Sequence, residues 1–354
     1  MVRILHTADL HRGAPSAHPI YNTRALPELV NLAIRKRCDY ILIVGDIFDK
    51  PKPDQVVKDF LVRQLLDTKK QIDFIFIPGN HDYTTKALEY HSVNYLHYLR
   101  EASNYKGNIY VIEPGEYRSF KNLSVFAMSK WEDIDVAVAA NDGKKPLVIA
   151  WHGTVPGIQF TNVTHVPKET IKSIKKILAK TNAQYIALGD IHQPIKLHPR
   201  CWYPGPPVQK AYSDEDGVLL VAMNLEKTKV KKYKLPLPKK ITLEVEFEEG
   251  VDSEETMIEF IRDNIPAGNF LKLKFELPLN LWGSINRKYV REALKDHCLE
   301  IKLENDPIPD VRTRKSIEKV SKAKSLQQEV DVVIDEEDLG LNKKKLRKIC
   351  RKYL

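Results

Sequence analysis

The chain has 354 residues, which suits two or three domains, and its 43% hydrophobic content excludes a wholly disordered chain. No run of about 18 apolar residues occurs, which excludes a membrane-spanning helix and leaves no reason to expect a membrane partner. The net charge of +9 is uneven, because residues 1–240 carry 35 Lys and Arg against 24 Asp and Glu, residues 241–310 carry 8 against 16, and residues 311–354 carry 13 against 7.

The first 225 residues alternate short apolar runs with amphipathic segments, a pattern typical of α/β domains. The apolar runs are nearly continuous, as in strands covered on both faces, and predict strands at 3–7, 40–44, 74–77, 147–150 and 185–188. Apolar residues recur at helical spacing in three segments between them, which predicts helices at 25–37, 55–68 and 168–180.

The proline-marked segment KVKKYKLPLPKK, residues 229–240, predicts a boundary after the first domain. The following residues alternate strand and helix patterns and predict a smaller α/β accessory domain. Residues 305–330 are polar, with two prolines, and are expected to form a linker. The chain is therefore divided into a first domain at 1–238, an accessory domain at 239–304, a linker at 305–330 and a basic helical segment at 331–354.

The N-terminal residues MVRILHTADLH turn polar too early for a signal peptide. The four cysteines lie far apart and form no CxxC pair, which argues against a zinc finger and suits a reducing compartment. We therefore expect a cytoplasmic protein, or one in the host cytoplasm if its source is viral.

All five predicted strands of the first domain run into polar, metal-capable side chains. Open α/β sheets bind ligands at the carboxyl ends of their strands, so these side chains predict one shared site. Taken singly, each has an ordinary alternative, such as a turn, a helix cap or a satisfied core histidine. In chain order they are Asp9 and His11, then Asp46, then Asn80, His81 and Asp82, then His152, and finally Asp190 and His192.

Seven of these nine side chains, taken as ligands, suit two metal ions about 3.5–4 Å apart, an arrangement that clamps a phosphorus centre during in-line displacement. Mixed oxygen and imidazole ligands favour manganese, iron or zinc over calcium. Such ions would lower the pKa of a bound water from 15.7 towards ~7 and would neutralise charge on the phosphate.

The motifs D-x-H, GD, GNHD, H and G-x-x-H, in this order, resemble those of the calcineurin-like metallophosphoesterases. More narrowly, GDIFD at 45–49, Tyr203-Pro204-Gly205 followed by Gln209, and the accessory domain resemble SbcD-like nuclease subunits of SbcCD-type repair complexes, phage-encoded ones included. The resemblance covers roughly residues 1–305. It implies a β-sandwich core flanked by helices, and a two-metal DNA exonuclease and endonuclease in end processing, recombination or repair.

The resemblance also implies roles for the site residues. Asp9, His11, Asp46 and His192 would hold one metal, and Asp46, Asn80, His152 and Asp190 the other. His81 would be an acid that does not bind metal. Asp82 would either orient His81 or serve only as a turn carboxylate.

Asp190 departs from the family pattern, because the family usually reads G-H-x-H and this chain reads G-D-I-H. An aspartate makes the formal ligand charge −3 instead of −2. Such a site should favour Mn²⁺, or else Mg²⁺, over Zn²⁺. The alternative is that Asp190 makes no contact and the second metal is weakly held.

The resemblance further implies DNA and an SbcC-like coiled-coil ATPase as partners, in a heterotetramer that contains a homodimer of this chain. Residues 331–354 should tether the ATPase, because a predicted helix after Asn342 combines an apolar stripe with seven Lys and Arg residues; DNA or a membrane are alternative surfaces for it. The accessory domain is acidic, so DNA phosphate contacts are expected mainly from the first domain and from six lysines near its end. The alternative is that these six lysines belong only to a solvated linker. They are Lys229, Lys231, Lys232, Lys234, Lys239 and Lys240.

Three other functions share parts of this pattern. A protein phosphatase would have an Arg after the second Asp motif, where this chain has Phe48 and Asp49. It would also have a Glu after GNH, where this chain has Asp82. A nucleotide or cyclic-nucleotide phosphodiesterase would use the same metal chemistry without needing the accessory domain or the basic tail. A metal-free scaffold would keep the fold, and the near-complete ligand set argues against it.

Overall fold

The structure is a computed structural model that describes residues 1–15, 18–68, 72–84, 91–96, 109–131, 143–158, 166–247 and 253–307. The predicted C-terminal helical segment at 331–354 and most of the predicted linker at 305–330 lie outside these ranges. Among the described helices, none combines the length and the apolarity that crossing a bilayer requires.

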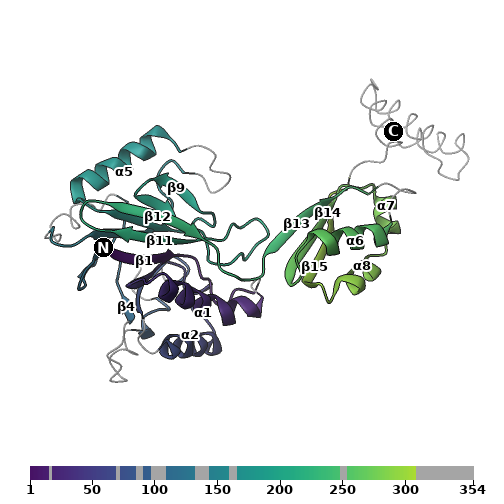
Figure 1. The fold of residues 1–354 in the computed structure, drawn as a ribbon, viewed down its shortest axis with the longest axis horizontal. Coiled ribbons are helices and arrows are strands. Elements are labelled where there is room, and N and C mark those ends of the chain that lie inside the picture. Colours follow the sequence, from purple (N-terminus) through teal and green to yellow (C-terminus); the bar gives the residue numbers. More distant parts are fainter. Residues whose placement is uncertain are drawn as a thin grey trace, which may run out of the picture. The chain divides into compact units, whose positions relative to one another are not determined.

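The first of two compact units, Met1–Lys239, contains two six-stranded sheets packed face to face (Figure 1). The first sheet has the order β12-β11-β1-β2-β3-β4, from β1 (Val2–Thr7), β2 (Tyr40–Val44), β3 (Asp73–Ile77), β4 (Ile109–Val111), β11 (Val218–Met223) and β12 (Thr228–Tyr233). The second has the order β5-β6-β7-β8-β10-β9, from β5 (Tyr117–Ser119), β6 (Ser124–Ala127), β7 (Leu147–His152), β8 (Tyr185–Gly189), β9 (Ile195–His198) and β10 (Cys201–Tyr203).

The core forms because alternate apolar residues of both sheets face each other. Leu42 and Ile75 of the first sheet and Val148 and Ala187 of the second belong to this inner cluster, and all four are fully buried. The outer faces are covered by helices: α1 (Pro19–Arg35) packs on β1 and β2, α2 (Gln55–Asp67) is tied to α1 through Gln64, and α5 (Lys168–Thr181) packs on the second sheet. The predicted α/β class, with a sandwich core flanked by helices, is confirmed.

Two boundaries differ from the predictions. Helix α1 begins at Pro19 rather than residue 25, because the His18 side chain accepts a hydrogen bond from the Ile20 N–H at its start. The segment interpreted as a boundary, residues 229–240, contains the division between the two units, after Lys239, but its first five residues belong to the edge strand β12. Asn224 closes a turn by accepting hydrogen bonds from two N–H groups, and β12 then pairs antiparallel with β11.

The described part of the second unit begins at Lys240 and contains a three-stranded parallel sheet. Leu271, Leu273 and Phe275 of its central strand are fully buried, in one cluster with Ile261 and Val290 of the helices. Ser253 and Asn286 cap two of the helices by accepting N–H hydrogen bonds. The elements are β13 (Lys240–Val245), α6 (Glu254–Asn264), β14 (Asn269–Phe275), α7 (Leu279–Ser284), α8 (Arg287–Leu294) and β15 (Cys298–Asn305); α7 was not predicted.

Candidate metal centre

The site lies where β1, β2, β3, β7 and β8 end. Four of its residues adopt left-handed backbone conformations, with φ of 55° at Asp9, 39° at His11, 47° at Asp46 and 101° at Asp190. Such conformations cost about 1–3 kcal/mol each and cluster at functional sites. Here the turns are held by backbone hydrogen bonds, among them the His11 N–H to the Asp46 carbonyl at 2.8 Å.

Two glycines let the loops approach closely enough to form the cluster. At Gly45, whose φ is 83°, an added Cβ would lie 1.8 Å from the His152 ring nitrogen Nδ1. At Gly79 a Cβ would lie 2.3 Å from the Asp46 backbone nitrogen and from its carboxylate. Any side chain at these two positions would therefore displace His152 or Asp46, which are predicted ligands.

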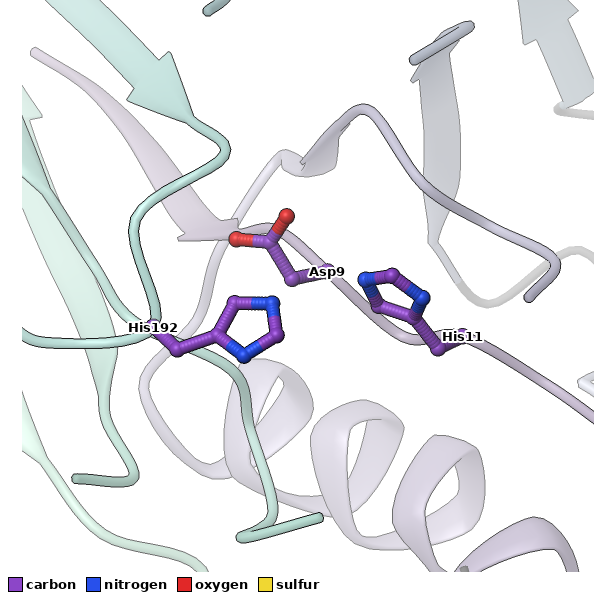
Figure 2. A group of neighbouring side chains, drawn as sticks. All are labelled: Asp9, His11 and His192. Carbon is purple, nitrogen blue, oxygen red and sulfur yellow. The ribbon is translucent and has the colours of Figure 1, made fainter. Parts of the chain in front are cut away.

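Asp9, His11 and His192 form one group whose potential ligand atoms lie within 4.8 Å of one another (Figure 2). The Nε2 atom of His11 is buried and has no hydrogen-bond partner in the structure. Burial and the nearby Lys210 lower the pKa of His11 to about 2, so its imidazole is neutral and offers a lone pair. A buried, unpartnered imidazole nitrogen beside carboxylates is well suited to a metal ion.

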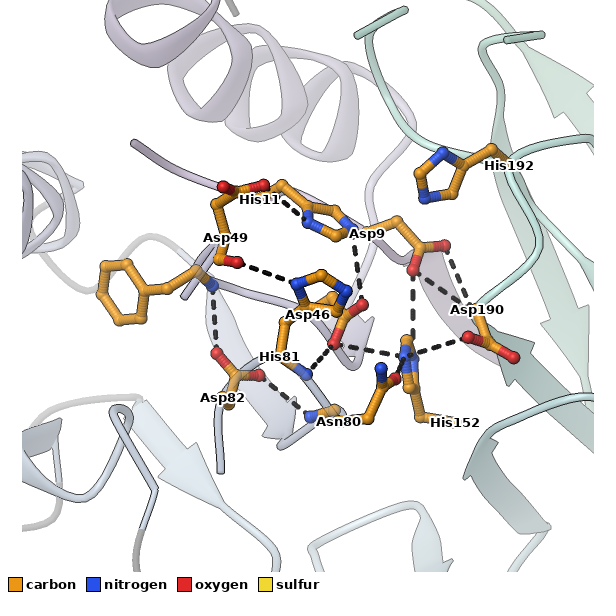
Figure 3. A network of polar contacts seen from close by, with 12 residues as sticks. Asp9, His11, Asp46, Asp49, Asn80, His81, Asp82, His152, Asp190 and His192 are labelled. Atoms are coloured by element: carbon orange, nitrogen blue, oxygen red, sulfur yellow. Dashed lines mark hydrogen bonds and ion pairs between the residues drawn. The ribbon is translucent and has the colours of Figure 1, made fainter. Parts of the chain in front are cut away.

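Asp46 lies between two sets of potential ligands (Figure 3). Its Oδ2 atom is 3.3 Å from His11 Nε2, and its Oδ1 atom is 3.3 Å from His152 Nε2. Burial alone would raise the Asp46 pKa, but His152 and the N–H of His81, which donates to Oδ1 at 2.9 Å, hold it below its usual range. The carboxylate is therefore ionised and faces both sets at once.

His152 is oriented in the manner of a metal-binding histidine. Its Nδ1–H donates to the Val44 carbonyl at 2.9 Å, so Nε2 is the ring nitrogen that faces the neighbouring oxygens. That Nε2 lies 2.9 Å from the Asn80 carbonyl oxygen Oδ1. Burial alone would lower the His152 pKa, but Asp46, Asp9 and Asp190 raise it well above its ordinary value. The surrounding acceptors thus favour a cation at this position.

Asp190 lies at the edge of this second set. Its Oδ1 atom is 3.9 Å from His152 Nε2, its Oδ2 accepts a hydrogen bond from Thr154 at 2.8 Å, and its own N–H donates to Asp9. Among the described residues, Asp190 is in none of the three groups whose ligand atoms lie within 4.8 Å of one another. Its backbone is anchored to the site, while its carboxylate is bound to Thr154.

His81 is exposed, and its ring lies beside that of His11, with centroids 4.7 Å apart. Its Nδ1 is 2.8 Å from the Asp49 carbonyl oxygen. A carbonyl can only accept, so Nδ1 carries a hydrogen and Nε2 is the atom left to exchange a proton. His81 also belongs to a potential ligand group with His11 and Asp46.

The sequence profile of the calcineurin-like phosphoesterases matches residues 2–194, more than half of the chain, and this range contains all five strand-end motifs. The chain belongs to this family. The predicted membership is thus confirmed, and the clustered carboxylates and imidazoles are candidate ligands for the divalent metals that this phosphoesterase fold uses.

Two relatives are DNA double-strand break repair proteins named Mre11. The phosphoesterase is 22% identical to the Archaeoglobus fulgidus protein over 212 residues, which are 54% of this chain and 46% of that one. It is 33% identical to the Saccharolobus solfataricus protein over 89 residues, 23% of each. The chain thus spans less than half the length of either relative.

The fold comparison gives weaker similarities. A dimetal phosphatase from Danio rerio is 10% identical, with a TM-score of 0.40 over 65% of this chain and 98% of that one. TT1561 of Thermus thermophilus is 15% identical, with a TM-score of 0.41 over 65% and 98% of the two chains.

Asp82 of the phosphoesterase was predicted either to orient His81 or to be a turn carboxylate. It is fully buried and accepts four hydrogen bonds of 2.9–3.1 Å, from the backbone N–H groups of Ile47, Phe48 and Gly79 and from the hydroxyl of Ser92. These bonds tie the loop after β2 to the loop after β3, which carry Asp46 and Asn80. The geometry therefore assigns Asp82 to holding two loops together.

Four residues of the site were not predicted from the sequence. Asp49 lies 3.2 Å from His11 Nδ1, and Thr154 donates to Asp190. Asp214 lies 3.5 Å from His192 Nδ1, and Lys210 Nζ lies 3.3 Å from His192 Nε2. Burial lowers the Lys210 pKa to about 8. Asp49 belongs to the noted GDIFD motif and Lys210 follows Gln209, but no periodicity distinguishes them from ordinary surface charges.

The six predicted DNA-binding lysines separate into distinct environments. Lys229 and Lys231 are exposed on β12. Lys232 pairs with Glu215, and Lys234 and Lys239 both pair with Asp216. Lys240 begins the second unit, where its ammonium group lies over the Phe270 ring.

Proposed function

We propose that this chain is a two-metal-dependent DNA nuclease, working as an SbcD-like subunit in DNA end processing, recombination or repair. The observation that carries the hydrolase part is Asp46, whose two oxygens face the imidazole Nε2 atoms of His11 and His152. One bridging carboxylate between two ligand sets is what a metal pair requires. The DNA part is supported by the similarity to two proteins named for double-strand break repair.

Asp9, His11, Asp46 and His192 would hold one ion, and Asp46, Asn80, His152 and Asp190 the other. The ions, when bound, would supply a water acidic enough to act as hydroxide near pH 7 and positive charge against the phosphate. Manganese is the proposed metal, with magnesium as the alternative, because three aspartates make the set strongly anionic. The chain's own contribution is to fix the ligands through the strained turns at the ends of the strands.

His81 would donate a proton to the leaving oxygen. Its Nδ1–H is occupied by the Asp49 carbonyl, so Nε2 is the atom available to the substrate. The side chain is exposed, as a group that meets an incoming phosphodiester has to be. General acid catalysis of this kind contributes about 10²–10⁴-fold in rate.

The proposed partners are DNA and an SbcC-like ATPase, with a homodimer of this chain inside a heterotetramer. The proposed tether to the ATPase is residues 331–354, which lie outside the described part of the chain. DNA phosphates would be contacted mainly by the first unit and by the basic segment at 229–240.

The test is hydrolysis of linear and hairpin DNA by the purified chain with Mn²⁺ or Mg²⁺, with and without a candidate ATPase. Cleavage that EDTA abolishes and Mn²⁺ restores is expected. Hydrolysis of cyclic nucleotides but not of DNA would instead identify a nucleotide phosphodiesterase. A purified chain that binds neither metal would be a scaffold, and the proposal would fail.

A further inference from the structure

A hollow of about 750 Å³, here called the basic groove, opens on the first unit at the start of β1, whereas the metal cluster lies beyond its end. Arg3 in the groove precedes Asp9 in the cluster by six positions, which is at most about 20 Å at ~3.3 Å per strand residue. The basic groove is therefore distinct from the metal centre. Its charged lining consists of Arg3, Arg35, Lys36, Arg37, Lys229 and Lys231.

The strand register explains why these side chains meet. Arg3 pairs with Ala222, and Ala222 pairs with Lys229, so the three side chains form one row on one face of the sheet. Lys231 lies in the next row on that face, opposite Leu220. The small side chain of Ala222 leaves the hollow between the two cations of its row.

The end of helix α1 supplies the other wall. Arg35 is its last residue, Lys36 caps it, and the Arg3 guanidinium donates to the Lys36 carbonyl at 3.2 Å. The ammonium groups of Lys36 and Lys231 lie 4.8 and 5.3 Å from the centre of the same Tyr233 ring. These contacts hold the walls of the basic groove in place without neutralising them.

No acidic residue lines the basic groove, and within the described ranges none of its six cations forms an ion pair with a carboxylate. The neighbouring Asp39 accepts hydrogen bonds from the Arg3 backbone N–H and from Asn122 instead. The lysines just outside differ, because Lys232 and Lys234 are paired with acids. Like charges gathered without acids repel one another and attract a polyanion.

We propose that the basic groove binds the sugar-phosphate backbone of DNA at a distance from the metal centre. Three neighbouring strands, at about 4.8 Å each, spread the cations over about 10 Å. Duplex DNA presents one negative charge per about 1.7 Å, so about six charges fall within that span. Arg35, Arg37, Lys229 and Lys231 are exposed, which suits a long polyanion better than a small phosphate that needs enclosure.

This inference rests on the proposed function for its choice of DNA, and it adds an anchoring surface remote from cleavage. Such contacts carry no sequence information, so binding through the basic groove should be independent of sequence. They should appear as a dependence of affinity on salt, because each neutralised phosphate releases counterions.

The test is a triple variant, Arg35→Gln, Lys229→Gln and Lys231→Gln. The matched control removes three ion-paired lysines outside the basic segment 229–240 and so changes the net charge equally: Lys172→Gln, Lys295→Gln and Lys302→Gln. Binding to a cleavage-resistant phosphorothioate duplex is measured with Mn²⁺ from 50 to 200 mM salt. The groove variant should lower the slope of log Kobs against log salt by about 2.7, which is three contacts at about 0.9 each, and the control by clearly less.

Hydrolysis of bis(p-nitrophenyl) phosphate separates this inference from the proposed function. The groove variant should retain the wild-type rate on this small diester, since it leaves the metal centre intact. An unchanged salt slope, or equal changes in variant and control, would overturn the role of the basic groove. A groove variant that kept its affinity for DNA but no longer bound poly-glutamate would also overturn it, because the groove would then bind an acidic protein. DNA binding through the groove by a wild-type chain without any diesterase activity would overturn only the proposed hydrolase.

Discussion

Replacing Asp82 by Ala removes the shared acceptor of four buried hydrogen bonds. Three of the donors are the backbone N–H groups of Ile47, Phe48 and Gly79, and the fourth is the Ser92 hydroxyl. Alanine removes the carboxylate that these three buried N–H groups share as their acceptor. The two loops that carry Asp46 and Asn80 then lose their common anchor.

The magnitude follows from those three donors. An unsatisfied buried donor costs about 1–3 kcal/mol, so the variant should lose roughly 3–6 kcal/mol after partial relaxation and water entry. A domain of this size shifts its Tm by about 2–4 °C per kcal/mol, which gives a fall of roughly 6–24 °C. Ser92→Ala is the matched control, because it removes one donor and leaves the carboxylate satisfied by the other three, so its fall should be much smaller.

Thermal unfolding and metal titration together check this reasoning. If Asp82 anchors the loops, Asp82→Ala should lower Tm and weaken binding of Mn²⁺, while His81→Ala should do neither. If Asp82 only orients His81, the two variants should behave alike, with slow hydrolysis, normal Tm and full metal content. That second result would refute the anchoring role.

Four further predictions concern the site, its stability and its partner. His81→Ala should lower the rate of DNA hydrolysis by about 10²–10⁴-fold and keep both metals, whereas Asp46→Ala should lose metal and activity together. Elemental analysis measures the metal content, and a His81→Ala variant without metal would contradict the role assigned to His81. Asp190→His should shift metal preference from Mn²⁺ towards Zn²⁺ in competition titrations, and an unchanged preference would mean that Asp190 is no ligand. Burial lowers the pKa of His6 to about 3, whereas the unfolded chain binds this proton below about pH 6.5, so the free energy of unfolding should be full above pH 6.5 and fall towards pH 3. In urea unfolding, His6→Gln should reduce the loss of stability between pH 6.5 and 5 by up to about 2 kcal/mol. Parallel pH curves for the wild type and the variant would contradict this reasoning. Deleting residues 331–354 should abolish co-purification with an SbcC-like ATPase while metal-dependent cleavage of short single-stranded DNA survives, and a stable complex of the truncated chain would exclude this tether.

Some details of the fold were beyond sequence reasoning for identifiable reasons. Strands such as β9 (Ile195–His198) and β10 (Cys201–Tyr203) are only four and three residues long, too short for a periodic signal. Strand β12 reads TKVKKY, and its lysines suit an exposed edge strand as well as a solvated linker. Only pairing with β11 distinguishes the two.

The sequence by itself determined the chemistry of the site, because each predicted ligand follows a buried strand directly. The residue type and the strand end are both local properties, and the carboxyl ends of neighbouring parallel strands meet at one edge whatever the rest of the chain does. Asp9, His11 and Asp46 can therefore be predicted to lie together from the sequence alone. His152 and His192 follow strands of the other sheet, and only the packing of the two sheets brings them to the same site.

Tertiary structure alone decided how these groups are oriented and what supports them. The hydrogen bond that turns His152 Nε2 towards Asp46 is donated by His152 Nδ1–H to the carbonyl of Val44, 108 residues away in the chain. Asp82 became a loop anchor, and Arg3 and Lys229 became neighbours in the basic groove, through contacts between distant segments. Such contacts depend on which strands become neighbours in the sheet, and a local pattern of residues does not show which strands distant in the sequence will pair.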